Sequence, residues 1–338
     1  MTATENSAQP DLPASLGLDS ADPALVARVG ADLGRVEDLL RAVVHSDVDF
    51  VDQAALHLVK AGGKRFRPLF TLLAAEVNEG ATDAVVAAAA AVELVHLATL
   101  YHDDVMDEAT MRRGDESANA RWDNSIAILT GDFLFAHASM LVADLGPVAT
   151  RVIAETMREL VTGQMRETVG PRDDDPIEHY LSVIGQKTGS LIATSGRYGG
   201  MFSGATAAQT ESLYRFGEVI GAAFQISDDV IDIASPATES GKTPGTDLRE
   251  GVRTLPMLYA LADDADPRLN HLLAGPIHDD AEVEEALELL RRSSGLERAR
   301  KTLDSYADRA HAELAALPAG AARDALELLT RYVVERTR

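Results

Sequence analysis

Hydrophobic residues recur at spacings of three and four along most of the chain, which is the pattern of amphipathic helices. Two clear runs are Leu33, Val36, Leu39, Leu40 and Val43, and Val283, Ala286, Leu287, Leu289 and Leu290. Alternating strand patterns are nearly absent. The sequence therefore predicts an all-α antiparallel bundle, with helices of roughly 10–25 residues. The loops, marked by Gly, Pro and Asp, are expected near 61–64, 78–83, 111–117, 170–176, 235–254, 263–267 and 274–280.

The organisation along the chain predicts one domain. Residues 1–22 are rich in Ser, Ala, Pro and Asp, a composition typical of a disordered tail. No low-complexity linker interrupts residues 23–338, and 338 residues are ample to bury a hydrophobic core. We expect residues 23–338 to form a single all-α domain.

The longest apolar stretch runs over 84–92 and continues to Leu100, but Glu93 and His96 interrupt it. A membrane-spanning helix needs about 20 mainly apolar residues. A buried central helix is therefore the better interpretation. Before Arg28 there is no basic residue, and no apolar signal segment is visible. We expect a cytoplasmic protein without a membrane anchor, which leaves peripheral contact with membranes open.

The overall charge narrows the classes of partner. The net charge is −23, from 54 acidic and 31 basic residues, so the chain should repel nucleic-acid phosphates. There is no cysteine, which excludes disulfides and thiolate metal sites. Nucleic acid is therefore not an expected partner.

Two stretches with the pattern Asp-Asp-x-x-Asp carry the chemistry. The first comprises Asp103, Asp104 and Asp107, and the second comprises Asp228, Asp229 and Asp232. On a helix, the first and last Asp of each motif project from one face. Each motif follows an apolar run, and buried acids need partners or metal ions. Solvated acidic faces are the alternative, but this context favours Mg²⁺, which prefers carboxylate oxygens and shares its shell with phosphates.

The few basic residues gather beside glycines and the acidic motifs. Gly62 to Pro68 reads GGKRFRP, Arg112 and Arg113 follow the first Asp motif, and Lys187 and Lys242 each precede a Thr. Arginine binds phosphate oxygens in a bidentate manner, and glycine lets backbone amides approach. Taken singly, each cation could be a solubilising charge. Their placement beside the Asp motifs predicts a site where Mg²⁺ and cations hold a diphosphate.

Together these segments resemble the trans-isoprenyl diphosphate synthases, or polyprenyl synthetases. The segments are GGKRFRP at 62–68, LYHDDVMDEATMRRG at 100–114, GDFL at 131–134, KTGSL at 187–191, and 224–256. They occur in the family's order, and the resemblance covers roughly residues 30–335. It implies antiparallel helices around a deep central cavity, usually in a homodimer, with the two Asp motifs facing each other.

The resemblance also implies roles by position. Asp103 and Asp107 would bind Mg²⁺ from one wall and Asp228 from the other, two to three ions in all, with support from Asp104, Asp229 and Asp232. The allylic diphosphate would be held by Arg112, Lys187, Thr188, Gln225 and Lys242, with Lys187 also counted as catalytic. Isopentenyl diphosphate would be held by Lys64, Arg67, His96 and Arg113. At position 252 many members of the family have Lys, whereas this chain has Val252. Arg253, the next residue, would supply the positive charge instead.

The implied reaction is head-to-tail elongation. Mg²⁺ would assist departure of the allylic diphosphate, and the double bond of isopentenyl diphosphate would attack the resulting cation. Loss of a proton would then restore an alkene. Cations at the mouth and apolar residues along 84–101 suit a charged leaving group and a dry pocket.

In the family that the chain resembles, the residues five and four before the first Asp help to set the depth of the cavity, so the resemblance bears on product length. They are Ala98 and Thr99, both small, with Val95 and Ala91 one and two turns further back. A helical turn rises about 5.4 Å, so each cleared turn admits about one more isoprene unit. We expect an all-trans product of about six to ten units (C30–C50) by this scaling, of the kind used in quinone side chains. Tight helix packing is an equal reason for small residues here.

Alternatives from other classes remain at this point. A shorter-chain synthase, making farnesyl or geranylgeranyl diphosphate, would share every motif. A terpene cyclase usually lacks the second full Asp motif and the GGKRFRP segment. A non-catalytic partner subunit tends to lose Asp motifs, and a plain helical binding protein would not respond to Mg²⁺ with diphosphate.

Overall fold

The computed structural model describes residues 16–234, 244–263 and 266–337. Its helices are α1 (Pro23–Val43), α2 (Asp49–Lys60), α3 (Phe66–Ala75), α4 (Asp83–Met106), α5 (Ala118–Arg121), α6 (Asn124–Asp144), α7 (Pro147–Val169), α8 (Pro176–Ile184), the π-helix η2 (Gly185–Gly189), α9 (Ser190–Phe202), α10 (Ala207–Ala234), α12 (Thr246–Glu250), α13 (Leu255–Ala262), α14 (Pro267–Leu272), α15 (Asp280–Arg292), α16 (Ser294–Leu314) and α17 (Ala321–Glu335). The predicted all-α class is confirmed.

A two-stranded hairpin interrupts the helical pattern. Strands β1 (Met111–Arg112) and β2 (Asp115–Glu116) pair antiparallel, with Met111 opposite Glu116. The sequence predicted a plain loop here, because two-residue strands leave no alternating pattern to detect. A short helix, α12, likewise lies inside the segment 235–254 that was expected to be a loop.

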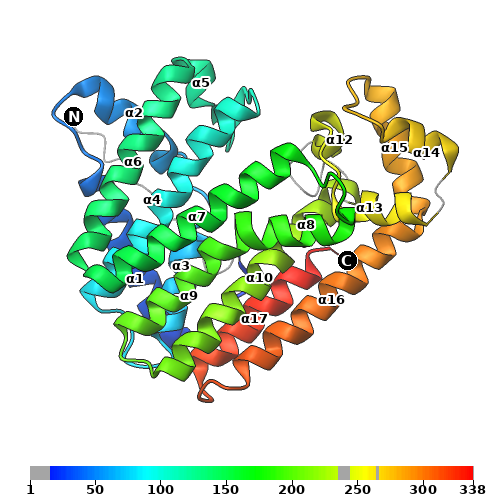
Figure 1. Cartoon of the computed structure of the whole chain (residues 1–338). Coiled ribbons are helices and arrows are strands. Elements are labelled where there is room, and N and C mark those ends of the chain that lie inside the picture. The colour runs from blue at the N-terminus through cyan, green and yellow to red at the C-terminus, as the bar shows by residue number, and fades with distance from the viewer. Residues whose placement is uncertain (1–15, 235–243, 264–265, 338) are drawn as a thin grey trace, which may run out of the picture.

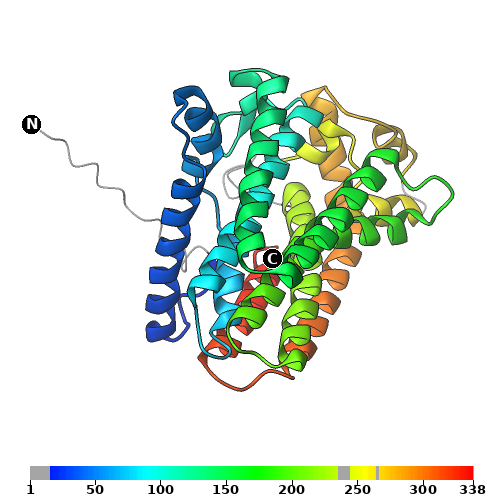
Figure 2. The same ribbon diagram turned by 60° about the vertical axis from the view of Figure 1, so that its left-hand side comes forward.

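Two long helices, α4 and α10, form the centre of the bundle (Figure 1). α4 packs on α3, α6 and α9, while α10 packs on α9, α16 and the π-helix η2. Thr82 caps the start of α4 by accepting from the Val85 nitrogen at 3.2 Å. Viewed from both directions, α12 to α15 gather on the opposite side of the bundle from α1 and α2 (Figure 2).

α4 and α6 are both long and apolar enough to cross a membrane by length and composition alone. The two differ in burial: 72% of the apolar window of α4 is buried in the bundle, but only 33% of that of α6. α4 is thus a core helix, as its sequence predicted, whereas α6 leaves an apolar face uncovered within this chain.

Residues 16–22, which were expected to belong to a disordered tail, are part of the described structure. Leu16 and Leu18 are buried in the hydrophobic core, ahead of Asp22, which caps α1 through the Leu25 nitrogen at 2.9 Å. The sequence did not predict that Leu16 and Leu18 are buried, because two leucines in a Ser- and Asp-rich segment form no periodic pattern. Residues 1–15 lie outside the described part of the chain.

Candidate active site

The first Asp motif ends α4, and its three carboxylates are not equivalent. Asp104 is fully buried and accepts from Arg112, whose Nε lies at 2.6 Å and Nη2 at 2.5 Å. Burial raises the pKa of Asp103 to about 6, although the charge of Lys187 opposes this rise. Burial also raises the pKa of Asp107, again against Lys187. Asp104 therefore anchors the β-hairpin, and Asp103 and Asp107 are the pair that borders Lys187.

The second Asp motif, on α10, also has a buried middle Asp, but its other two carboxylates have partners within the chain. Asp229 is buried and accepts from the Tyr180 hydroxyl and, at 3.0 Å, from Gln225 Nε2. Burial outweighs these bonds and raises the pKa of Asp229 to about 7. Asp228 is ion-paired with Arg336 at 2.9 Å. In both motifs the middle Asp is thus tied into the fold.

Asp232 joins the second motif to α12. Its carboxylate accepts from the Thr246 nitrogen at 3.2 Å and the Asp247 nitrogen at 3.3 Å. α12 ends at Glu250, whose pKa is raised by burial and by the charges of both Asp107 and Asp232. Because both motifs act on one carboxylate, they border a common space.

The π-helix η2 brings Lys187 and Thr188 to this space. Lys187 Nζ lies 2.5 Å from Glu167 Oε2 on α7. The Thr188 hydroxyl donates to Gln225 Oε1 at 3.3 Å, so Thr188, Gln225 and Asp229 form a hydrogen-bonded chain. π-Bulges often occur at functional sites because they re-aim side chains within a helix.

The carboxylates suit Mg²⁺ that is shared with a substrate. Within the described residues, no three His, Cys, Asp or Glu side chains already surround one point. Burial nevertheless raises the pKa of Asp103, so a nearby cation would favour its charged form. In the described part of the chain, Asp104 Oδ2 is buried without a hydrogen-bond partner. Hard carboxylate donors that border one space fit Mg²⁺, which completes its shell with water and phosphate oxygens. Asp103, Asp107 and Asp228 are the residues that would hold it.

The predicted residues Lys64, Arg67, His96 and Arg113 are called here the basic cluster. Arg67 and Arg113 both act on His96, whereas Lys64 is exposed and its Nζ lies 5.6 Å from the centroid of the Phe224 ring. Arg67 Nε is buried, and no described residue bonds it. Burial lowers the pKa of Arg67 to about 10, and Arg113 adds to this. Burial and the charges of Arg67 and Arg113 also lower the pKa of His96 well below its usual 6.5. Like charges that lie close together repel one another, and a bound anion would offset this repulsion.

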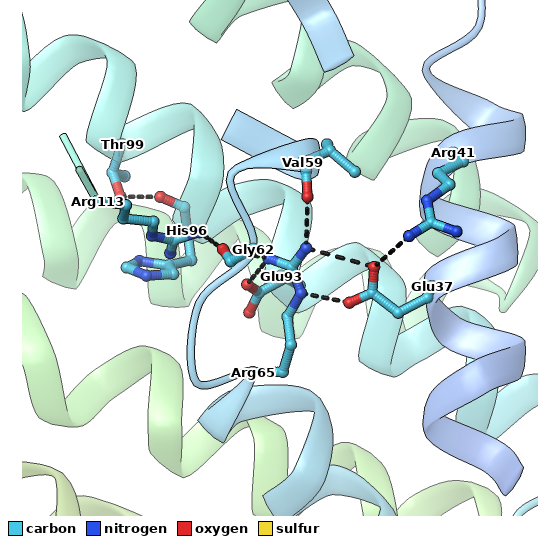
Figure 3. Close-up of polar contacts among 9 residues, drawn as sticks. All are labelled: Glu37, Arg41, Val59, Gly62, Arg65, Glu93, His96, Thr99 and Arg113. Carbon is cyan, nitrogen blue, oxygen red and sulfur yellow. Dashed lines mark hydrogen bonds and ion pairs between the residues drawn. The ribbon is translucent and has the colours of Figure 1, made fainter. Parts of the chain in front are cut away.

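Glycine explains how Arg113 approaches the loop between α2 and α3. Gly63 has φ +129°, and a β-carbon there would lie 2.7 Å from Arg113 Cζ. Arg113 also donates to the Gly62 carbonyl oxygen (Figure 3). The glycine pair therefore leaves room for a guanidinium. The basic cluster draws its residues from the α2–α3 loop, the first turn of α3, the turn of the β-hairpin and α4.

The residues expected to set product length lie on α4 before the first motif. Ala98 is fully buried, as is Ala91, and Val95 is 1% exposed. Thr99 is partly buried and donates to the His96 carbonyl oxygen at 2.8 Å. Small residues thus occupy this face of α4 over two turns.

Two of the predicted positions are not placed at this site by the described residues. Lys242 lies outside the described residues. Arg253 is exposed on the loop after α12, where it borders a crevice of about 820 Å³ with Glu167 and Tyr180. Its role as a substitute at Val252 remains a prediction.

Sequence reasoning missed four residues that organise the site: Arg65, Glu93, Tyr180 and Arg336. Glu93 is 1% exposed and pairs with Arg65 at 3.0 Å. A carboxylate inside an apolar helical run was the available signal for Glu93. Arg336 donates to Ser227 Oγ at 2.7 Å and the Phe224 carbonyl oxygen at 2.9 Å, contacts across 109 and 112 residues that no local pattern encodes.

Comparison with known proteins identifies the family of the chain. The profile described as Polyprenyl synthetase matches residues 48–290. A nonaprenyl diphosphate synthase of Mycobacterium tuberculosis is 56% identical over 324 residues, covering 95% of this chain and 97% of that protein. A dimethylallyltranstransferase of the same organism is 46% identical, covering 93% and 96% respectively.

A solved structure gives the same result. The geranylgeranyl pyrophosphate synthase of Corynebacterium glutamicum, in complex with calcium and isoprenyl diphosphate, is 52% identical with a TM-score of 0.84. The alignment covers 94% of this chain and 98% of that one. The chain belongs to the polyprenyl synthetase family. It is a polyprenyl diphosphate synthase, a prenyltransferase that condenses isopentenyl diphosphate with an allylic diphosphate, and the predicted reaction class is confirmed.

Proposed function

We propose that the Asp motifs and the basic cluster divide the two substrates between them. The allylic diphosphate lies between α4 and α10, with Asp103, Asp107 and Asp228 holding Mg²⁺ and Lys187 touching its oxygens. Isopentenyl diphosphate binds at the basic cluster through its diphosphate. The observation that carries this proposal is that the charges form two groups. Asp107, Asp232, Arg112 and Lys187 all act on the pKa of Glu250, so the two Asp motifs and these cations border one space. Arg67 and Arg113 instead act on the pKa of His96, and Arg113 on that of Arg67.

Each side chain then has a task in the reaction. Mg²⁺, when bound, neutralises the departing diphosphate and lowers the barrier to breaking the C–O bond. Lys187 adds a positive charge close to Asp103 and Asp107, where that negative charge develops. Arg67 and Arg113 orient the second diphosphate so that its alkene faces the allylic carbon. The buried apolar face of α4 keeps water from the allylic cation.

We propose a long product, within C30–C50, suited to quinone side chains. Ala98 and Thr99 place no bulky side chain on α4 before the first motif, and neither do Val95 and Ala91 one and two turns further back. The nonaprenyl diphosphate synthase that is 56% identical supports this length. A shorter product is the second candidate, because a geranylgeranyl pyrophosphate synthase is 52% identical.

Product sizing separates these candidates. The protein is incubated with isopentenyl diphosphate, Mg²⁺ and allylic primers of several lengths, and the products are resolved by reverse-phase chromatography. Accumulation of C30–C50 chains supports the long product. Products that stop at C20 from every primer would establish the shorter assignment. Omission of Mg²⁺ is the matched control and should abolish elongation, as the proposed Mg²⁺ dependence requires.

We also propose that the enzyme is a cytoplasmic homodimer formed through α6. Leu129 and Met140 on α6 are 62% and 64% exposed, and Met165 on α7 is 63% exposed. Large apolar side chains on a mostly uncovered apolar helix favour a second copy of the chain. In sedimentation velocity, the wild type should run as a dimer and Leu129→Asp as a monomer. A monomeric wild type would exclude this interface.

A further inference from the structure

Arg65 lies at the centre of a buried ion network beside the basic cluster (Figure 3). Its guanidinium donates to Glu37 on α1, and to Glu93 on α4 at 3.0 Å. It also donates to the carbonyl oxygens of Val59 at 2.8 Å and Gly62 at 3.2 Å. Two helices, the end of α2 and the following loop therefore converge on one side chain.

This network is costly to build. Arg65 is 4% exposed and Glu93 is 1% exposed, and buried ions lose their hydration. Arg65 also has φ +44°, in the left-handed region that non-glycine residues rarely adopt. Replacing buried ion pairs with apolar residues often leaves stability unchanged or improves it, so stability is a weak explanation for this one. A positional role explains it better.

The network touches the basic cluster at three points. Arg65 lies between Lys64 and Arg67 in the chain, at the start of α3. The Gly62 carbonyl oxygen accepts from both Arg65 and Arg113. Glu93 lies one helical turn before His96, and its charge acts on Arg67 and Arg113. A shift of Arg65 would therefore displace Arg67 in the first turn of α3 and Arg113 in the turn of the β-hairpin.

We propose that Arg65, held by Glu37 and Glu93, is a positioning residue that sets Arg67 and Arg113 for the diphosphate of isopentenyl diphosphate. The proposal rests on the assignment of the basic cluster to that substrate. Arg65 does not touch the diphosphate itself, because its donors are engaged by carboxylates and carbonyls. Its influence should fall on one substrate and spare the other.

The main test is Arg65→Lys, which keeps the charge but loses the planar fork that reaches all four groups. We expect the KM for isopentenyl diphosphate to rise about tenfold or more, since small misplacements of binding groups are costly. The KM for the allylic primer should change less than about twofold, because its site is on other elements. Glu93→Met is the second variant. A positional role predicts a higher KM for isopentenyl diphosphate, whereas loss of a repelling carboxylate alone predicts a lower one.

Two further variants make the result decisive. Arg41→Met removes a cation that also approaches Glu37, at 3.8 Å, but from the exposed side, and should leave both KM values unchanged. Arg67→Met tests the assignment itself and should raise the KM for isopentenyl diphosphate. If Arg67→Met has this effect and Arg65→Lys does not, the positioning role is wrong. If Arg65→Lys raises both KM values equally, the network is a general scaffold and the proposal is also wrong. If Arg67→Met has no effect, the assignment of the cluster fails, and the proposal with it.

Discussion

Gly163 on α7 lies so close to Lys187 that a β-carbon at position 163 would be 2.6 Å from the Lys187 backbone nitrogen. On the other side of η2, a β-carbon at Gly221 would lie 2.8 Å from the Gly189 α-carbon. The π-helix that presents Lys187 is thus held between two glycine-lined helices. Close backbone approach at these two glycines therefore helps to fix its position, together with the side-chain bonds of Lys187 and Thr188.

Gly163→Ala should therefore displace η2 and lower activity. We expect kcat to fall about tenfold or more from misplacement of Lys187, with a loss of about 1–3 kcal/mol in the free energy of unfolding from overpacking. Steady-state kinetics and urea denaturation measure the two effects. Gly30→Ala on α1 is the matched control, because nothing lies within 4 Å of its β-position, and it should leave kcat unchanged. Normal kcat in Gly163→Ala would show that η2 tolerates the shift.

Removing either metal-facing carboxylate should disable the reaction. Asp103→Asn and Asp228→Asn should each lower kcat by about 100-fold or more, since each removes part of the electrostatic stabilisation of the leaving group. The dependence of rate on Mg²⁺ concentration should also shift to higher concentrations. Asp173→Asn, in the exposed loop before α8, is the control and should behave as the wild type. An Asp103→Asn enzyme with normal Mg²⁺ dependence would refute the assignment.

His96 should make stability depend on pH. Burial and neighbouring arginines hold its pKa well below 6.5 in the folded protein, so below pH 6.5 the unfolded chain binds the proton first. The contribution of a neutral His96 is complete above pH 6.5 and is lost as the pH falls, at up to about 1.4 kcal/mol per pH unit. Denaturation of the wild type and His96→Asn at pH 7.5 and 5.5, values that bracket pH 6.5, measures the difference.

In that experiment, His96→Asn should lose less stability than the wild type on acidification. The exposed His278→Asn is the control and should follow the wild type. Equal losses in His96→Asn and the wild type would mean that His96 is protonated as easily in the folded protein as in the unfolded one.

Bulk on α4 should shorten the product. Ala98→Phe or Thr99→Phe should place an aromatic ring in the path of the growing chain and remove about one isoprene unit or more for each blocked turn of about 5.4 Å. Thr99 is partly buried, so its variant is the safer one to fold if Phe overpacks the fully buried Ala98 position. Ala31→Phe, exposed on α1, should leave product length unchanged. Unchanged chromatograms for both folded α4 variants would exclude this face as the length determinant.

The fold class and several residues of the candidate site could be predicted from the sequence, because the patterns that indicate them are local. The all-α class follows from hydrophobic spacing, and the pairs Asp103/Asp107 and Asp228/Asp232 follow from helical geometry. The glycines and cations of the GGKRFRP segment predict a site that binds an anion. Product length also has a local signal in Ala98 and Thr99, though size alone does not separate a cavity from tight packing.

Only the tertiary structure shows which residues of each motif pair with other residues of the chain. Asp103 and Asp104 are adjacent and chemically identical, yet one borders Lys187 and the other is buried against Arg112. Arg65 and Arg67 are likewise two residues apart, and only Arg65 meets Glu37 and Glu93, each 28 residues away in sequence. The sequence by itself determined the helices and the chemistry of the site. Only the folded chain decided which charges are neutralised internally and which are left for substrate, because burial and long-range pairing depend on where the helices pack.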